Sequence, residues 1–331
     1  MKDKYIFIIS KDVDDSTNIV MKWLDRFGVK VIRTGDYIWI KSIEIKKTNS
    51  VFDVTLNFNT GISLKMEQII GFWYRKSILP ILKGLEIILP NDYSIIKEEY
   101  IDYLEKEESG ALKQFLIHEF EKINHLGNIK AENGNKLIAF RIAEEVGLKT
   151  PDFLISSDSN KLNKRLKKGG YIVKPIQDGF QTYNEGILFK NYYSNTFDLN
   201  MFKNIENEIF PSCIQNYISK KIEIRTFYIK GEMYSMAIFS QSNKETEVDF
   251  RNYSEDKPNR FVPFILPDEI EIKLIKLMKR LNLNTGSIDL VLTSSNDYVF
   301  LEVNPSGQYG MIEASCFYGL DKLISKELVN K

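Results

Sequence analysis

The pattern of apolar positions at the start of the chain predicts a strand, a helix and a second strand. Residues 5–10 and 29–33 are short apolar runs, and residues 16–27 between them repeat apolar positions at helical spacing. Gly28 follows the helical pattern directly, where a residue with left-handed backbone commonly ends a helix. Together with a further apolar run at residues 69–75, this predicts an N-terminal α/β domain.

The next part of the sequence has a helical pattern and contains the first predicted domain boundary. A long charged pattern over residues 93–124, with a break expected near Ser109 and Gly110, predicts the helix that closes the first domain. A second helical pattern over residues 132–146 ends at a glycine. We place the boundary within residues 127–135.

Strand patterns dominate the remainder of the chain. Apolar runs bounded by polar residues and glycine predict strands at residues 153–155, 171–176, 186–189, 213–218, 222–229 and 232–240. Lys230 and Gly231 are expected to form a two-residue hairpin turn, and segments 241–247 and 251–259 are expected to be loops. The resulting division has three parts, residues 1–127, 128–212 and 213–331.

The last two apolar runs predict a hairpin that gathers oxygen ligands on one face. If Thr293 pairs with Tyr298 across the turn, the same register sets Asp289 opposite Glu302. Alternation places Asn304 on the face of Glu302. The opposite face is expected to be aliphatic and buried, and its members are Ile288, Leu290, Leu292, Val299, Leu301 and Val303.

Two carboxylates that face each other across paired strands repel unless positive charge compensates them. Magnesium is one candidate, because it prefers oxygen ligands and is usually held by one or two carboxylates and phosphate oxygens. The alternative is a solvated hairpin face on which Lys or Arg neighbours neutralise the acids. The residues of the hairpin alone leave both interpretations open.

Charge and composition exclude several other classes of protein. The chain has 331 residues with 45 Lys+Arg and 45 Asp+Glu, so its formal net charge is zero and no global field attracts nucleic acid or an anionic membrane. No apolar segment reaches the length of a membrane helix. The only cysteines, Cys213 and Cys316, exclude a disulfide framework and favour a cytoplasmic location.

The sequence also offers little to covalent or zinc catalysis. His118 and His125 are the only histidines, and on one helix they would share a face, which leaves a zinc site and ordinary helix-surface histidines as alternatives. No G-x-S-x-G motif is present.

The hairpin and the strands before it resemble the ATP-grasp ligase superfamily. Glu302-Val-Asn304-Pro305 resembles the second metal motif, with Asp289 in the place of the first metal carboxylate. Lys136 and Lys174 resemble the two nucleotide lysines, and the resemblance extends from about Asn124 to the last residue. It implies an α/β chain with α+β lobes, in which an N-terminal α/β pre-ATP-grasp domain precedes the ATP-grasp fold.

The resemblance also implies the site residues and two cofactors, ATP and Mg²⁺. The residues implied to bind ATP are Lys136, Lys174, Gln215, Tyr217, Ile218, Glu223 and Arg225. The implied metal ligands are Asp289, Glu302 and Asn304. Among these, Gln215-Asn-Tyr217-Ile218 corresponds to the hinge that bonds adenine, and Glu223-Ile-Arg225 to the ribose acid and a phosphate-binding arginine.

Two departures from the superfamily pattern affect the interpretation. Residues 177–186, after the second lysine, are poorer in glycine than many phosphate loops. Ser287 stands where members similar to D-alanine ligase carry an arginine. The charge of a tetrahedral intermediate must then be met elsewhere, and we assign this catalytic role to Arg225 and Arg251.

A narrower resemblance is to the ATP-grasp peptide maturases of the graspetide family, of the microviridin and grasp-with-spasm types. Residues 72–76, Phe-Trp-Tyr-Arg-Lys, resemble their N-terminal signature, residues 249–251 their Asp-Trp/Phe-Arg element and residues 304–309 their Asn-Pro turn. The implied activity is ATP-dependent joining of Asp/Glu side chains to Ser, Thr or Lys side chains in a ribosomal precursor peptide with a leader segment. The resemblance leaves open a radical-SAM SPASM partner protein and a homodimer.

Each motif also has a structural interpretation. Lys174 can be a strand-edge lysine that extends to solvent, Lys136 a solvated lysine, and Glu223 with Arg225 a weak ion pair within one strand. Arg75 can contact the peptide or phosphate, or can lie against Trp73. Asp12, Asp14 and Asp15 are expected to mark a helix N-terminus and not a metal site.

Two rival functions follow from the same residues. One is a carboxylate–amine ligase of the superfamily that acts on a small molecule or adds glutamate to a protein. The other is a non-catalytic regulator that binds nucleotide.

Overall fold

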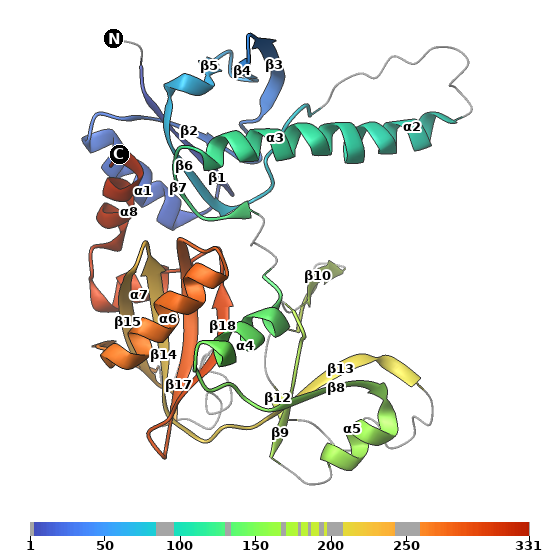
Figure 1. Ribbon diagram of the computed structural model, residues 1–331, viewed down its shortest axis with the longest axis vertical. Helices are drawn as coiled ribbons and strands as arrows, with labels where there is room; N and C mark the ends of the chain where they lie inside the picture. Colours follow the sequence, from blue (N-terminus) through green and yellow to red (C-terminus); the bar gives the residue numbers. More distant parts are fainter. Residues whose placement is uncertain are drawn as a thin grey trace. The chain divides into compact units, whose positions relative to one another are not determined.

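The computed structural model describes nine stretches of the chain, which are residues 3–83, 96–129, 134–166, 170–177, 180–184, 187–191, 195–196, 208–241 and 259–330. The chain forms two compact units (Figure 1). The first contains Met1–Glu132 and Gly319–Lys331, and the second contains Asn133–Tyr318.

The first unit is built on a four-stranded parallel sheet with the order β2-β1-β6-β7. Its strands are β1 (Tyr5–Ser10), β2 (Lys30–Thr34), β6 (Ile69–Lys76) and β7 (Asn124–Leu126). Helix α1 (Asp15–Arg26) connects β1 to β2, and Gly28 follows it with φ +71°. The strand, helix and strand expected at the start of the chain are therefore confirmed, and each of their ends lies within one residue of its expected position.

An antiparallel sheet that the sequence did not predict is inserted between β2 and β6. It consists of β3 (Ile40–Thr48), β4 (Val51–Phe58) and β5 (Ser63–Lys65), and a 3₁₀ turn at Met66–Gln68 leads into β6. The core of the unit contains three completely or almost completely buried phenylalanines. The Phe120 ring stacks on those of Phe7 and Phe72, with centroids 4.7 and 4.8 Å away.

The long helical region is continuous and has no break at Ser109. Helix α2 (Lys97–Tyr103) passes through a π-helical segment, Leu104–Glu108, into α3 (Ser109–Glu121). Expected helical residues 93–95 lie outside the described residues. His118 lies in α3 whereas His125 lies in β7, so the expectation that they share a helix face, and with it the zinc interpretation, is wrong.

The end of the chain returns to the first unit. Helix α8 (Leu320–Val329) packs beside α1 (Figure 1). Asn124 Nδ2 donates to the carbonyls of Glu327, Leu328 and Asn330 at 2.7, 3.0 and 2.8 Å, which satisfies the end of α8. The predicted third domain included this helix, whereas the structure places it in the first unit.

The described residues of the second unit form two larger sheets and one two-stranded sheet. One is four-stranded with the order β12-β9-β13-β8, formed by β8 (Phe153–Asp158), β9 (Tyr171–Lys174), β12 (Asn195–Thr196) and β13 (Glu208–Asn216). Helix α5 (Ser159–Leu166) packs on it through Leu162, which is buried with Ile214. A separate hairpin joins β10 (Phe180–Asn184) and β11 (Ile187–Asn191).

The other larger sheet is antiparallel and five-stranded, with the order β16-β15-β14-β17-β18. Its strands are β14 (Lys220–Ile229), β15 (Glu232–Phe239), β16 (Arg260–Phe264), β17 (Thr285–Thr293) and β18 (Tyr298–Asn304). The helices of this unit are α4 (Lys136–Glu145), α6 (Asp268–Arg280) and α7 (Gly310–Cys316), besides α5. The expected turn at Lys230 and Gly231 is confirmed, because Ile229 pairs with Glu232.

Two expectations about the rest of the chain can be compared only with the residues that the structure describes. Most of the loops expected at 241–247 and 251–259 lies outside the described residues. Among the helices that the structure describes, none is both long and apolar enough to span a bilayer.

Candidate functional site

A β-bulge brings the two predicted metal carboxylates face to face. Asp289 pairs with Glu302, as predicted, but Leu292 and not Thr293 pairs with Tyr298, so the predicted pairing at the turn is wrong by one residue. The register shifts between Asp289 and Leu290, which leaves Leu301 as the additional residue of β18. Without this bulge the register of the turn would place Glu302 on the other face of the hairpin.

The bulge also changes the buried face of the hairpin. Phe300 pairs with Leu290, and both side chains are completely buried. Val299 pairs with Val291 on the face of Asp289, so the expectation that Val299 belongs to the aliphatic face is wrong. Phe300 lies edge-on to Phe140 of α4, with ring centroids 6.1 Å apart.

A cation compensates each of the two opposed carboxylates. Lys136 Nζ lies 2.9 Å from Glu302 Oε2, and Arg225 Nη1 lies 3.6 Å from Asp289 Oδ2. All four side chains are at most about a quarter exposed. The sequence left open whether a metal or Lys/Arg neighbours neutralise these acids. In the structure the neighbours are Lys136 and Arg225, which the resemblance assigned to ATP.

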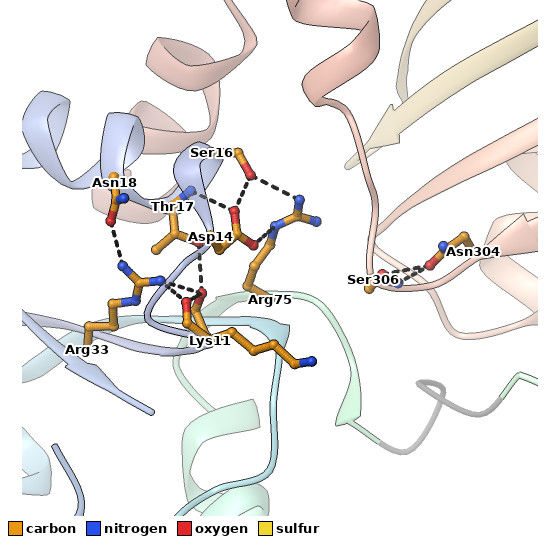
Figure 2. A network of polar contacts seen from close by, with 10 residues as sticks. Lys11, Asp14, Ser16, Thr17, Asn18, Arg33, Arg75, Asn304 and Ser306 are labelled. Atoms are coloured by element: carbon orange, nitrogen blue, oxygen red, sulfur yellow. Dashed lines mark hydrogen bonds and ion pairs between the residues drawn. The ribbon is translucent and has the colours of Figure 1, made fainter. Parts of the chain in front are cut away.

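The donor set fits a hard cation in part. Two carboxylates in register supply the oxygen ligands that Mg²⁺ prefers. Asn304 Oδ1 accepts hydrogen bonds from the backbone N and the Oγ of Ser306, at 3.0 and 2.7 Å (Figure 2). Because an amide oxygen has two lone pairs, metal binding through this oxygen would require one of these bonds to open. The described residues contain no group of three or more His, Cys, Asp or Glu side chains suited to a metal.

The central strand β14 carries Glu223 and Arg225 on the face of Asp289. Arg225 pairs directly with Asp289 across β17, and Glu223 pairs with Val291. Both residues are buried, at 8% exposure each. The structural alternative of an ion pair between Glu223 and Arg225 is not what the contacts show, because Arg225 contacts Asp289 while Glu223 accepts from Lys220 at 2.8 Å.

Two lysines from different elements act on one buried thiol. Asn135 caps α4, with its side chain accepting from Leu137 N at 2.9 Å, and this cap places Lys136 in the first turn. Lys174, at the end of β9, pairs with Cys213 of β13. Burial raises the pKa of the Cys213 thiol, while the charges of Lys136 and Lys174 oppose this shift.

The predicted adenine hinge connects the two larger sheets of the second unit. Gln215 is buried in β13 between β8 and β9, where it pairs with Phe153 and Ile172. Tyr217 and Ile218 follow in the short link to β14, and the backbone N of Tyr217 donates to Gly170 O at 2.7 Å. These three residues therefore lie at the connection between the four-stranded and the five-stranded sheet.

Some predicted residues are not placed, and some residues of the site were not predicted. Arg251 and residues 249–250 lie outside the described residues, as do parts of the predicted phosphate loop. Ser287 is buried, and its Oγ donates to Gln308 O at 2.8 Å, so it supports the Asn-Pro turn. Lys220, Ser240 and Cys213 were missed because they belong to no motif. The one available signal for Lys220 was its position just before an apolar strand run.

In the first unit, Arg75 belongs to a polar network at the carboxyl end of β1 (Figure 2). Its Nε lies 3.2 Å from Asp14 Oδ2, and its guanidinium lies 6.0 Å from the centre of the Trp73 ring. Asp14 is the N-cap of α1 and accepts from Thr17 N, as expected of a helix N-terminus. Burial raises the pKa of Asp14, but Arg75, Ser16 and the cap hydrogen bond outweigh it and hold that pKa below 3.8.

No family model and no curated protein matches the sequence, whereas solved structures match the fold. A RiPP-associated ATP-grasp ligase from Chryseobacterium gregarium, in complex with ADP and a leader and core peptide, has a TM-score of 0.75 and 21% identity over 98% of this chain and 95% of its own. The macrocyclase MdnC from Microcystis aeruginosa, bound to the precursor peptide MdnA, has a TM-score of 0.73 and 20% identity over 99% and 100%.

A third similar structure is that of the ATP-grasp ligase PsnB with a phosphomimetic variant of its minimal precursor, Mg and ADP. It has a TM-score of 0.67 and 13% identity over 99% of each chain. The similarity to all three covers both units, the first of which carries none of the superfamily's nucleotide motifs. The chain therefore has the ATP-grasp fold, preceded by an N-terminal α/β unit, as the motifs predicted.

Proposed function

We propose that this protein is an ADP-forming ATP-grasp ligase that activates carboxylates of a peptide and joins them to hydroxyl or amine groups of the same peptide. The observation that carries the proposal is the register of Asp289 with Glu302, each beside a cation. A metal–triphosphate carries both positive and negative charge. The opposed acids can bind its metal ion, and the adjacent lysine and arginine can bind its phosphate oxygens.

The nucleotide is bound by residues of both larger sheets in the second unit. Lys136 and Lys174 bind phosphate oxygens, and the hinge residues Gln215, Tyr217 and Ile218 bind the adenine. Glu223 accepts from the ribose hydroxyls. Asp289, Glu302 and Asn304 would hold Mg²⁺, which when bound neutralises phosphate charge.

The reaction proceeds through an acyl phosphate. A substrate carboxylate oxygen attacks the γ-phosphorus of ATP, and the bond to ADP breaks. A hydroxyl or amine of the substrate then attacks the acyl carbon, loses its proton, and displaces inorganic phosphate, which leaves an ester or amide. Arg225 and Arg251 donate to oxygens that become negative in these steps, which replaces the arginine absent at Ser287.

The proposed substrate is a ribosomal precursor peptide that carries a leader segment. The similar ligase from Chryseobacterium gregarium is in complex with a leader and core peptide, and MdnC is bound to a precursor peptide. A D-alanyl-alanine synthetase from Vibrio cholerae covers the chain as fully but has a TM-score of only 0.53, against 0.75 and 0.73 for the two peptide-bound ligases, which supports a peptide over a small molecule. Asp/Glu side chains would be joined to Ser, Thr or Lys side chains as macrocyclic esters or amides; a radical-SAM SPASM partner and a homodimer stay predictions of the sequence.

The test is the conversion of a co-expressed precursor. The chain is produced with candidate precursors, chosen as short reading frames near its gene that are rich in Thr/Ser and Asp/Glu. We expect mass spectrometry to show the loss of one water per ring. The variant Glu302→Gln should abolish this loss while circular dichroism shows an intact fold, because it removes one carboxylate of the metal pair.

Two further measurements separate the rival functions. Glu232→Gln, an exposed glutamate at the start of β15, is the matched control and should retain full conversion. Full conversion by Glu302→Gln would refute the metal assignment. ATP-dependent ligation of free amino acids without peptide would favour the small-molecule ligase, and the absence of peptide-stimulated ADP release would favour the regulator.

A further inference from the structure

A buried ion pair lies on the same face of the five-stranded sheet as the carboxylate pair. Lys220 Nζ donates to Glu223 Oε1 at 2.8 Å, and Ser240 Oγ donates to the same oxygen at 2.8 Å. The Lys220 and Glu223 side chains are 5% and 10% exposed, and Ser240 is completely buried. Because a buried lysine is unfavourable unless it is paired, its position depends on these contacts.

A bulge in β14 makes the contact possible. Residues three apart in a regular strand point to opposite faces, so Lys220 and Glu223 would normally not meet. Lys220 pairs with Thr293 whereas Ile222 pairs with Leu292, which leaves Lys221 as an additional residue. The bulge turns Lys220 onto the face of Glu223, and bulges of this kind commonly direct a side chain towards an active site.

We propose that Lys220, assisted by Ser240, is a positioning residue that holds Glu223 in the orientation in which it binds the ribose of the nucleotide. This inference rests on the proposed function, in which Glu223 accepts from the ribose hydroxyls. Two donors on one carboxylate oxygen fix the last torsion of the glutamate side chain. The ammonium also compensates the charge of a buried carboxylate, and an ionised carboxylate only accepts hydrogen bonds, which suits a partner made of hydroxyl groups.

A purely structural ion pair would behave differently. Its loss would loosen the sheet and weaken the binding of every adenine nucleotide to a similar extent. The loss of a positioning residue affects only the nucleotides whose ribose hydroxyls Glu223 contacts. The two roles are therefore separated by comparing ADP with 2′,3′-dideoxy-ADP.

The experiment is isothermal titration calorimetry of the full chain with these two nucleotides. The unmodified chain should bind ADP more tightly than 2′,3′-dideoxy-ADP. Lys220→Met should weaken ADP binding about tenfold, the effect of one hydrogen bond to a charged group, and leave 2′,3′-dideoxy-ADP binding unchanged. Ser240→Ala should act in the same direction with a smaller effect, and Lys220→Arg should restore most of the ADP affinity.

Lys221→Met is the matched control, because Lys221 is the adjacent lysine, is exposed, and donates to Asn296 Oδ1 at 2.7 Å. It removes the same charge from the same strand and should leave both affinities unchanged. If Lys220→Met does not fold, as thermal unfolding would show, Ser240→Ala carries the test without removing a charge.

Three results would contradict the positioning role. These are an equal loss for both nucleotides in Lys220→Met or Ser240→Ala, no loss for either in both variants, and a retained preference for ADP in Glu223→Gln. An unmodified chain that binds neither nucleotide would instead contradict the proposed function. A chain that binds ADP but fails the comparison leaves that function intact.

Discussion

Each carboxylate at the centre of the site contacts a cation that we assign to the nucleotide. Glu302 contacts Lys136, and Asp289 contacts Arg225. These contacts offset the repulsion that the register of the two acids would otherwise cause. In the proposed ligase, the bound nucleotide and metal would exchange one set of ion pairs for another.

The sequence predicted these residues because their motif has few alternatives. Glu302, Asn304 and the following proline form a recognisable motif, whereas the pairing of Asp289 with Glu302 also depends on the bulge at Leu301. Lys220 could not be predicted in this way, because strand alternation directs it away from Glu223 and only the bulge in β14 reverses this. A bulge depends on how the whole sheet pairs and leaves no local pattern in the chain.

At the residue scale, the Asp14 and Arg75 ion pair predicts a dependence of stability on pH. Asp14→Asn retains a good N-cap but removes the negative charge that lies 3.2 Å from Arg75 Nε, a side chain only 7% exposed. We expect the variant to lose about 2–4 kcal/mol of unfolding free energy at neutral pH. Urea unfolding followed by circular dichroism measures this difference.

The sign of the pH dependence follows from the lowered pKa of Asp14. A carboxyl group whose pKa is lower in the folded state stabilises the fold above its unfolded pKa, close to 3.8, and this contribution is lost as the pH falls through the folded pKa. The difference between the unmodified chain and Asp14→Asn should therefore shrink below about pH 4. A difference that stays constant as the pH falls well below about 4 would show that the ion pair is not its source.

At the scale of elements, the first strand, helix and strand and the later hairpins were predicted, whereas the small antiparallel sheet and the ranges of helices α5 to α8 were not. Strand β4 buries every second residue from Val54 to Phe58, a period-two signal, but most of the neighbouring β3 is polar and exposed. The turn between β17 and β18 was misplaced by one residue. Five residues, 293–297, separate the last pair, Leu292 and Tyr298, and they include Asn296 at φ +67°, a conformation that the turn residues permit but do not specify.

The N-terminus of α4 gives a prediction at this scale. Asn135→Ala removes the acceptor for Leu137 N and Ile138 N, which should cost about 1 kcal/mol of unfolding free energy. Because Lys136 is the first helical residue, fraying of this turn should also weaken ADP binding severalfold. Denaturant unfolding and calorimetry measure the two effects. Asn135→Ser keeps a capping side chain, and a similar loss in that variant would contradict the role of the cap.

At the scale of the whole molecule, the two ends of the chain meet in one unit. The last predicted domain, residues 213–331, included α8 only by its place in the sequence, but the partners of this helix are α1, β6 and β7 of the first unit. The packing of α8 on the first unit cannot be inferred from local sequence patterns, because these do not show against which element a helix packs its apolar face. Asn124 Nδ2, which donates to three carbonyls at the end of α8, and Gly71 are the residues that accommodate it.

Gly71 lies close to the backbone of α8, so we predict that one added methyl group at this position displaces the C-terminal helix. A Cβ at this position would lie 2.3 Å from the carbonyl oxygen of Leu328 and 2.7 Å from Ile6 Cδ1. Because the first contact is with backbone, Gly71→Ala must displace α8 or β6, and we expect a loss of about 2–4 kcal/mol. Hydrogen exchange read by mass spectrometry should show faster exchange in residues 320–329.

Gly110 provides the matched control, because it lies within α3 and a Cβ there would meet no atom within 4 Å. Gly110→Ala should stabilise the chain by about 0.5–1 kcal/mol, since alanine favours a helix over glycine by about this amount. Its exchange in residues 320–329 should match that of the unmodified chain. Unchanged exchange and stability in Gly71→Ala would show that α8 does not depend on this contact, and would leave Asn124 as the residue that holds the end of the chain.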